Sequence, residues 1–193
     1  MDHRLQRIEN EWALLQRMAE ANPASLVLGD RGADEFLLEL RGTPAPVNNC
    51  DPVRLCREHK LRFSFARFFP TVPIEAYLVH PVFHPNVHPV SGFVCLWGRS
   101  SVADTVIEAL CQLQSVMTYA VFNDSSEHVM QPEALAWARD PARGVSLPLI
   151  CTPLSKPSKW NSERNFRSAP ARRRLSGRQI SHDIDKSKMH ALP

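Results

Sequence analysis

The chain has 193 residues, 44% of them hydrophobic, and a formal net charge of +3 at pH 7. This length suits one domain with a tail and is enough to bury a core, while the lack of any run of about 18 apolar residues argues against a membrane span. The charged N-terminus lacks the apolar core of a secretory signal, and five cysteines do not make a disulfide scaffold, so we expect a reduced, cytoplasmic setting.

The first predicted element is an N-terminal helix of roughly four turns. Apolar residues at three- and four-residue spacing predict its buried stripe, which consists of Leu5, Ile8, Trp12 and Leu15. Charged residues off this stripe include Arg4, Arg7, Glu11 and Arg17. The pair Asn22-Pro23 is typical of a helix end, because proline disfavours the helical conformation of the residue before it.

A run of four strands is expected after the helix. Residues 26–28 and 36–40 are apolar and flank the glycine-bearing segment 29–32, which predicts a hairpin. Apolar and polar residues alternate in 61–66, as on a half-buried strand, and residues 74–79 predict the fourth strand. Strands joined in succession by turns form an antiparallel meander, and helices on both sides of it in the sequence make the fold class α+β.

Two groups of cysteine and histidine residues have the composition of metal ligands but not their spacing. Cys50, Cys56 and His59 lie between the second and third predicted strands, with too wide a cysteine spacing and one ligand too few for zinc. The histidines at positions 80, 84 and 88 would meet only on a helix, which the prolines around them exclude. The sequence therefore predicts no metal site, and it indicates no cofactor.

The segment 83–97 is the part of the sequence most typical of an active site. Each proline removes a backbone donor and clashes with the preceding helical turn, so the segment is expected to form a compact, irregular loop. The prolines concerned are Pro81, Pro85 and Pro89. The loop ends in a short apolar piece that carries Cys95. A rigid loop built around Asn86 that presents a thiol predicts a catalytic site.

Two further helices are expected downstream. Residues 104–117 carry an apolar stripe at helical spacing, with Asp104 as the predicted N-cap. The polar loop 122–131 (FNDSSEHVMQ) follows, and Pro132 is well suited to begin a short helix that runs to Ala138.

Beyond Pro148 the apolar periodicity ends, and we expect a domain at 1–148 followed by a basic, disordered tail at 149–193. From Thr152 onward there are ten Lys and Arg against three Asp and Glu, which leaves 13 basic and 17 acidic residues in 1–151. The cluster Arg172-Arg173-Arg174 suits nucleic acid, an acidic partner or an anionic surface, or is simply solvated. The acidic body argues against a nucleic-acid adaptor.

The active-site segment resembles the motif of the ubiquitin-conjugating enzyme family, in which His-Pro-Asn precedes a Gly-x-Val/Ile-Cys-Leu segment. The chain has His84-Pro85-Asn86 and then Gly92-Phe93-Val94-Cys95-Leu96. Upstream, Phe69-Pro70-Thr71-Val72-Pro73 is similar to the family's aromatic-Pro-x-x-Pro segment. The chain departs from the pattern in three ways. The loop between Asn86 and Cys95 has one extra residue near Val90. The family's Trp-x-Pro after the cysteine is absent, and its fourth helix is missing or replaced.

The resemblance implies a fold with an N-terminal helix, a four-stranded antiparallel meander, an active-site loop, a crossing helix and a short C-terminal helix. It also implies an enzyme that accepts a ubiquitin-like modifier on Cys95 as a thioester from an activating enzyme. The modifier would then pass to an amine, usually a lysine of a protein target. A thiol suits this task because its thiolate is both a strong nucleophile and a good leaving group.

In the same resemblance, Asn86 stabilises the tetrahedral intermediate through its side-chain amide or holds the loop that does so. His84 and Pro85 shape the active-site loop. An acidic residue in the loop after the crossing helix positions the incoming lysine, and the candidates are Asp124 and Glu127, with His128 third. The segment 123–126 is equally typical of a simple turn.

The N-terminal helix of the family presents basic residues to the activating enzyme, which suggests Arg4 and Arg7 for that role. A solvated helix face accounts for the same two residues. The diverged flanks resemble bacterial relatives encoded beside ubiquitin-like proteins in antiviral, antiphage conjugation systems. The partners would then be a modifier, an activating enzyme and a deconjugating peptidase, with neither a membrane nor nucleic acid among them.

Two other functions compete with conjugation. One is a non-catalytic variant of the same fold that only binds ubiquitin-like proteins, although such variants lack the cysteine. The other is a cysteine hydrolase that pairs Cys95 with His84 or His88, which would need a third group to orient the histidine and backbone donors at a helix start.

Overall fold

The computed structural model describes residues 2–49, 53–96 and 102–157. They belong to one compact unit, Met1–Ser158. The rest of the chain, which includes most of the predicted tail and the arginine cluster at 172–174, lies outside the described residues. The disorder expected for the tail beyond residue 157 therefore stays a prediction.

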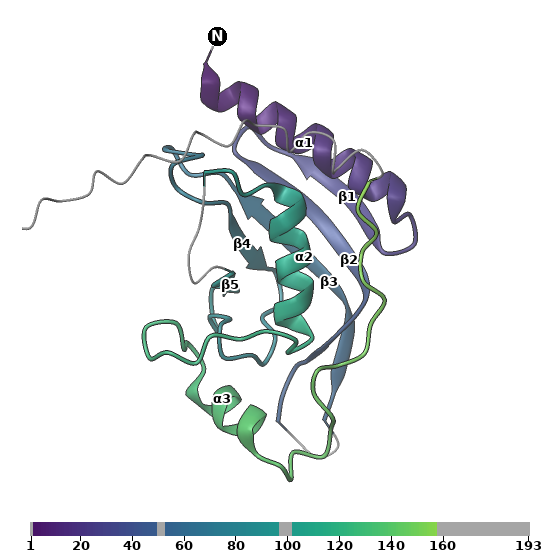
Figure 1. Ribbon diagram of the computed structural model, residues 1–193, viewed down its shortest axis with the longest axis vertical. Coiled ribbons are helices and arrows are strands. Elements are labelled where there is room, and N and C mark those ends of the chain that lie inside the picture. The colour runs from purple at the N-terminus through teal and green to yellow at the C-terminus, as the bar shows by residue number, and fades with distance from the viewer. Residues whose placement is uncertain (1, 50–52, 97–101, 158–193) are drawn as a thin grey trace, which may run out of the picture. The chain divides into compact units, whose positions relative to one another are not determined.

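The described chain combines one antiparallel sheet with three helices, as Figure 1 shows. The five strands pair in the order of the sequence, each antiparallel to the next. In chain order the elements are α1 (His3–Ala21), β1 (Leu26–Arg31), β2 (Glu35–Pro46), β3 (Leu55–Ser64), β4 (Glu75–Leu78), β5 (Phe93–Val94), α2 (Val106–Met117) and α3 (Pro132–Arg139). The predicted α+β class, with a helix first and a meander after it, is confirmed.

The sheet has one strand more than the sequence predicted. The two-residue strand β5 pairs with β4 through Ala76 opposite Val94 and Tyr77 opposite Phe93. Two residues are too few to show the alternation that identifies a strand, so the pattern indicated only a short apolar piece. This fifth strand leads directly into Cys95.

Strand β3 begins six residues earlier than the alternating pattern of 61–66 predicted, at Leu55. Cys56 and His59 therefore lie inside the sheet, opposite Ala45 and Leu40 of β2, and not between two strands as expected. The His59 ring is buried, its Nε2 lies 2.9 Å from the Thr43 carbonyl oxygen, and burial lowers the pKa of the imidazole. Cys50, the other member of this group, lies outside the described residues.

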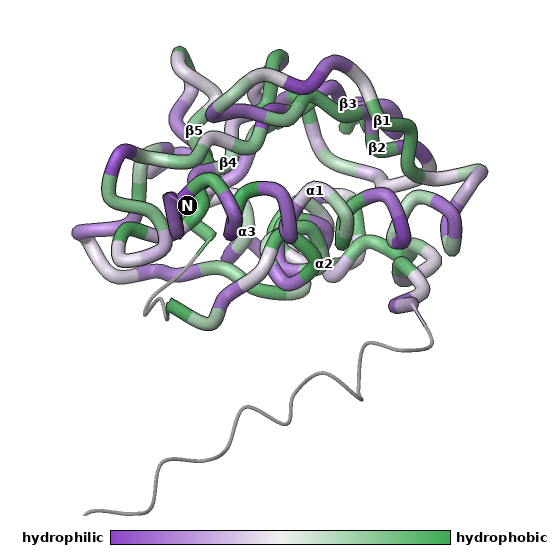
Figure 2. Tube along the Cα trace, turned by 90° about the horizontal axis from the view of Figure 1, so that it is seen from above, coloured by the Kyte–Doolittle hydropathy of each residue, from purple (hydrophilic) through white to green (hydrophobic). Residues whose placement is uncertain are grey.

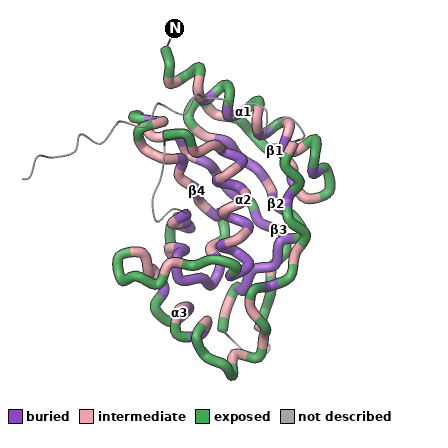
Figure 3. Tube along the Cα trace, viewed as in Figure 1, coloured by how far each residue is buried: buried purple, intermediate pink, exposed green. Residues whose placement is uncertain are grey.

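Helices α1, α2 and α3 lie on one side of the sheet, as Figure 2 shows. The core between these layers contains aromatic side chains, with the ring centroids of Phe36 in β2 and of Phe65, which follows β3, 4.6 Å apart. From α2, Ile107, Leu110 and Leu113 are fully buried against it. Figure 3 shows this buried band running through the strands and α2, with exposed residues along the outer side of α1.

The stripe that α1 buries differs from the predicted one. Its buried residues are Ile8, Glu11, Leu15 and Met18. Leu5, which was predicted to be part of the stripe, is 50% exposed. Glu11, which was placed off the stripe, is 1% exposed because its carboxylate accepts a 2.7 Å hydrogen bond from the Val106 amide of α2.

Helix α2 begins one residue later than expected, because its N-cap is Thr105 and not Asp104. The Glu108 amide donates to the Thr105 hydroxyl at 3.4 Å, and the Glu108 carboxylate accepts from the Thr105 amide at 3.0 Å. This reciprocal capping box satisfies amide groups that have no partner within the helix. The Thr105 hydroxyl and the Glu108 carboxylate together cap the helix better than the Asp104 carboxylate would alone.

Residues 149–157, which the sequence analysis assigned to the tail, pack along α2 and the end of α1. The Leu149 amide donates to the Thr118 carbonyl at 2.8 Å. The Leu154 amide donates to the Gln114 side-chain oxygen at 3.1 Å, and Leu154 is itself buried. The Ser155 amide donates to the Asn22 side chain at 2.7 Å. This segment is therefore part of the folded unit.

Candidate active site

Cys95 follows β5 and closes a short hairpin that begins at Asn86. The Cys95 amide donates to the Asn86 carbonyl oxygen at 2.9 Å, and Val87 and Val94 form an isolated bridge one step further in. The residue that lengthens this loop relative to the family motif lies in its turn, where Val90 is 85% exposed. The insertion therefore projects outward and leaves the backbone contact between Asn86 and Cys95 in place.

Gly92 allows this hairpin to lie against β4. Its φ is +71°, and a Cβ atom at this position would lie 1.9 Å from the Leu78 carbonyl oxygen. The close approach lets the Leu78 amide donate to the Gly92 carbonyl at 2.8 Å. Only glycine combines this backbone conformation with this lack of space.

His84 is sealed inside the loop and serves as a hydrogen-bond acceptor. Its Nδ1 accepts from the Asn86 amide at 3.1 Å, and its ring lies 4.4 Å from the Tyr119 ring, centroid to centroid. Burial lowers the pKa of His84 to about 3, against a weaker opposing effect of a backbone contact with Val121. The imidazole is therefore neutral at physiological pH, as an acceptor must be.

The Asn86 side chain ties the active-site loop to the loop that follows α2. It is 1% exposed, and its Nδ2 donates to the Asn123 carbonyl at 2.7 Å and to the His128 carbonyl at 2.9 Å. Its Oδ1 accepts from the Asn123 amide at 2.7 Å. Both amide hydrogens are thus committed to the second loop.

Further contacts join the same two loops. The Met130 amide donates to the Pro85 carbonyl at 2.7 Å. Gln131, the residue before α3, donates from its side chain to the carbonyls of Val82 and Val87 at 2.9 and 2.8 Å. Beneath them, the Phe83 and Tyr119 rings pack against Trp137 of α3. Residues 123–131 are consequently held against the loop that carries the predicted motif.

The contacts between these two loops place His128 beside the Cys95 thiol. The Cys95 Sγ lies 3.2 Å from the His128 Nδ1, and both side chains are partly exposed. The sequence analysis had weighed His84 and His88 as partners of Cys95 in a hydrolase. His84 is buried around Asn86, and the His88 Nδ1 accepts from the Ser91 amide at 3.0 Å.

A pocket of about 280 Å³ opens beside Cys95. Its lining consists of Asn86, Cys95, Leu96, Gln112, Val116, Val121, Phe122, Asn123 and Asp124. The Asp124 carboxylate is exposed and pairs with Arg139 of α3 at 2.6 Å. Glu127 is also exposed but does not line this pocket.

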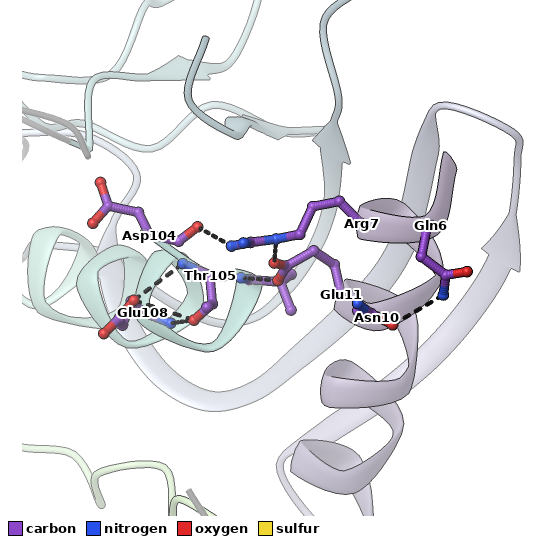
Figure 4. A network of polar contacts seen from close by, with 8 residues as sticks. Gln6, Arg7, Asn10, Glu11, Asp104, Thr105 and Glu108 are labelled. Carbon is purple, nitrogen blue, oxygen red and sulfur yellow. Dashed lines mark hydrogen bonds and ion pairs between the residues drawn. The ribbon is translucent and has the colours of Figure 1, made fainter. Parts of the chain in front are cut away.

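The two arginines assigned to the activating enzyme make contacts within the chain. Arg4 donates to the Phe65 carbonyl at 2.6 Å and pairs with Asp34 at 2.7 Å. Arg7 pairs with Glu11 at 2.7 Å, as Figure 4 shows together with the Asp104 and Thr105 end of α2. Burial raises the pKa of the Glu11 carboxyl, and the Val106 amide and Arg7 oppose that shift.

Among residues 2–49, 53–96 and 102–157, no group of three or more His, Cys, Asp or Glu side chains is arranged to hold a metal ion. Over the same residues, no helix is both long and apolar enough to cross a membrane. Among the described residues, Cys56, Cys95, Cys111 and Cys151 take part in no disulfide.

The α+β architecture of the folded unit is also found among solved structures. No protein-family model and no curated protein matches the chain. The crystal structure of a candidate ubiquitin conjugating enzyme from Plasmodium yoelii is similar to it with a TM-score of 0.50 and 16% sequence identity, over 70% of this chain and 84% of that one. At this identity the likeness shows the fold alone.

Proposed function

We propose that this chain is a conjugating enzyme for a ubiquitin-like protein, with Cys95 as the residue that carries the modifier as a thioester. The observation that carries the proposal is the position of the thiol. Cys95 is partly exposed beside a pocket, and its amide is bonded to Asn86 at 2.9 Å in a fold of the conjugating-enzyme type. An activating enzyme would supply the modifier in activated form, and a lysine of the target would receive it.

Asn86 acts in this proposal by holding the second loop against the thiol. The sequence left open whether its amide stabilises the tetrahedral intermediate directly or holds the loop that does. Its two amide hydrogens already bond to the carbonyls of Asn123 and His128, which favours the second role. His84 and Pro85 support it by fixing the backbone around Asn86.

The pocket beside Cys95 is the proposed entry for the target lysine. A lysine in water has a pKa near 10.4 and arrives with a positive charge, so a carboxylate at the entry would attract and orient it. Asp124 lines the pocket, and Glu127 does not, which makes Asp124 the stronger of the two candidates. Its pairing with Arg139 at 2.6 Å would have to loosen as the lysine enters.

Arg4 and Arg7 remain the candidates on α1 for contact with the activating enzyme. Both keep some exposure, with 20% of the Arg4 side chain and 28% of the Arg7 side chain accessible. The proposed setting is a bacterial antiphage conjugation system in the cytoplasm, with a modifier and a deconjugating peptidase as further partners. This setting rests on the divergence of the flanks from typical members.

A cysteine hydrolase is the second candidate function, and the contact between Cys95 and His128 favours it. A hydrolase also needs backbone donors for the oxyanion, which are often found at a helix start. Cys95 follows a two-residue strand instead. A non-catalytic binding variant would not need the Cys95 thiol.

Incubation with an activating enzyme, ATP and a panel of ubiquitin-like proteins tests the proposal, with non-reducing gels as the readout. We expect a modifier adduct on the wild-type chain that disappears on addition of thiol and is absent in Cys95→Ala. Cys111→Ala, which removes another partly buried free thiol, is the matched control and should keep the adduct. Cleavage of a ubiquitin-like substrate without activating enzyme or ATP would instead favour the hydrolase.

A further inference from the structure

The contact between Cys95 and His128 points to a step that the family motif does not assign. We propose that His128 is a catalytic base, which takes the proton of the Cys95 thiol during loading and the proton of the attacking amine during discharge. The inference rests on the proposed function, and the experiments below separate the failure of one from the failure of the other.

The geometry suits proton transfer between the two side chains. At 3.2 Å from Sγ to Nδ1, the pair can exist as a thiol that donates to a neutral imidazole or as an imidazolium that donates to a thiolate. Sulfur hydrogen bonds are longer than those of oxygen, so no rearrangement is required. Both side chains are only partly buried, so acyl donor and amine can approach.

The backbone of His128 is fixed from two sides. Its carbonyl accepts from the Asn86 side chain at 2.9 Å, and its amide donates to the Ser125 carbonyl at 3.0 Å. Since both contacts run through backbone atoms, substitution of the side chain removes the imidazole and keeps the anchor. Asn86 therefore acts as a positioning residue for this imidazole.

The other titratable groups near His128 lie on its own loop and on α3. Asp124 and Glu127 are exposed on the loop, and Arg139 of α3 pairs with Asp124 at 2.6 Å. From the strand side, Cys95 is the group that faces the ring.

During loading, the Cys95 S–H proton moves to the His128 Nδ1, and the thiolate attacks the thioester carbonyl carbon of the modifier. A new carbon–sulfur bond forms to Cys95, and the bond to the activating enzyme's cysteine breaks. The departing thiolate takes the proton from the His128 imidazolium. The modifier has changed sulfur atoms, and His128 is neutral again.

During discharge, the neutral His128 takes a proton from the amine as its nitrogen attacks the Cys95 thioester. A carbon–nitrogen bond forms, the bond to Cys95 breaks, and the departing thiolate receives the proton from His128 at 3.2 Å. The products are an amide and a free Cys95 thiol. Imidazole suits both directions because it changes charge near neutral pH.

Alkylation of the free enzyme tests the pair without any modifier. Iodoacetamide rates at each cysteine are measured by peptide mass spectrometry from pH 5.5 to 9.5 in the wild type, His128→Gln and the matched control His80→Gln, whose histidine is exposed on another loop. At pH 6.5 we expect Cys95 to react about tenfold more slowly in His128→Gln. His80→Gln should match the wild type, and an unchanged Cys95 profile in His128→Gln overturns the inference.

Within the wild type, Cys56 serves as an internal reference because it is also partly buried and outside any disulfide, and its thiol donates to the Glu58 carbonyl at 3.1 Å, with no imidazole as acceptor. If the imidazole activates Cys95, Cys95 reacts faster than Cys56 at pH 6.5. Equal or slower reaction of Cys95 contradicts the inference even if a His128 variant fails to fold.

Single-turnover discharge of loaded enzyme to free lysine tests the second step. We expect His128→Gln to slow discharge at pH 7 on the order of 10²-fold, with the loss shrinking as pH rises. If variant and wild type discharge alike, the inference fails and the proposed function stands. If alkylation depends on His128 but no activating enzyme ever loads Cys95, His128 remains assigned as the base for the Cys95 thiol. The proposed conjugating function then fails.

Discussion

Two polar networks in this protein are built alike and do different work. In one, the buried Glu11 side chain of α1 joins the start of α2 by accepting from the Val106 amide at 2.7 Å and pairing with Arg7. In the other, the buried Asn86 side chain joins two loops through Asn123 and His128. Each is 1% exposed and each links segments far apart in the sequence.

The difference lies in what each network leaves accessible. The Glu11 network ends at a helix start inside the fold, where a carboxylate meets an otherwise unpaired amide. The Asn86 network ends at the partly exposed Cys95 thiol beside a pocket, with the His128 Nδ1 3.2 Å from the sulfur. Burial and satisfied hydrogen bonds are therefore common to structural and functional networks, and accessible reactive atoms distinguish them.

The largest effect on stability is expected from Glu11→Ala. The change leaves the Val106 amide and the Arg7 guanidinium without the carboxylate inside the fold, and we expect the free energy of unfolding to fall by about 3 kcal/mol. Urea denaturation at pH 7 measures it, and Glu9→Ala, on the exposed side of α1, is the control.

If the two networks are independent, folded Glu11→Ala alkylates Cys95 at the wild-type rate. A changed rate would show that the α1 end of the fold also shapes the thiol site, and the distinction between the networks would then break down.

Asn86→Ala is expected to lower the free energy of unfolding less, by about 2 kcal/mol, since a neutral buried group is lost. Its main effect should be kinetic. Cys95 should still accept the modifier, while discharge to lysine slows on the order of 10²-fold, because the loop that carries His128 loses its anchor. Single-turnover discharge measures the effect.

Asn10→Ala, which removes an exposed asparagine side chain of α1, is the control and should discharge at the wild-type rate. Discharge by Asn86→Ala at the wild-type rate would remove Asn86 from the mechanism and leave it a structural residue like Glu11.

The smallest effect is a change in the pH dependence of stability at His84. The folded pKa of His84 is about 3, below the ordinary value of 6.5, so between these pH values the unfolded chain binds a proton that the folded chain does not. This group therefore lowers the free energy of unfolding by up to about 1.4 kcal/mol for each pH unit below 6.5.

His84→Asn keeps an acceptor for the Asn86 amide and lacks the titration, so its stability should depend less steeply on pH. Urea unfolding at pH 6.5 and pH 5 compares it with the wild type and with His80→Asn, whose exposed histidine should leave the slope unchanged. An equally steep slope in His84→Asn would mean that His84 is protonated in the folded state.

Local patterns predicted most of the fold and part of the site. Alternation and helical spacing indicated α1, the first four strands, α2 and α3, because these elements are long enough to show a period. The motif around Cys95 indicated the active-site loop, and prolines excluded a helix there. The two-residue strand β5 and the early start of β3 were missed, because strand pairing and not local pattern defines them.

Long-range contacts account for the residues that the sequence misjudged. The residue pattern of α1 predicts that Glu11 faces solvent. Burial of its carboxylate becomes favourable only because the first residues of α2 lie against it. The sequence analysis named His128 only as the third candidate for positioning the lysine. Its contact with the Cys95 thiol, across 33 residues of sequence, comes from the packing of the two loops.

The sequence by itself determined the α+β class, the loop that carries Cys95 and the glycine and prolines that shape it, because each depends on residues close together in the chain. Only the tertiary structure decided which histidine meets the thiol and where Asn86 directs its amide. Those choices follow from the packing of α3 and the loop after α2 against the active-site loop, and a local pattern of residues carries no information about such packing.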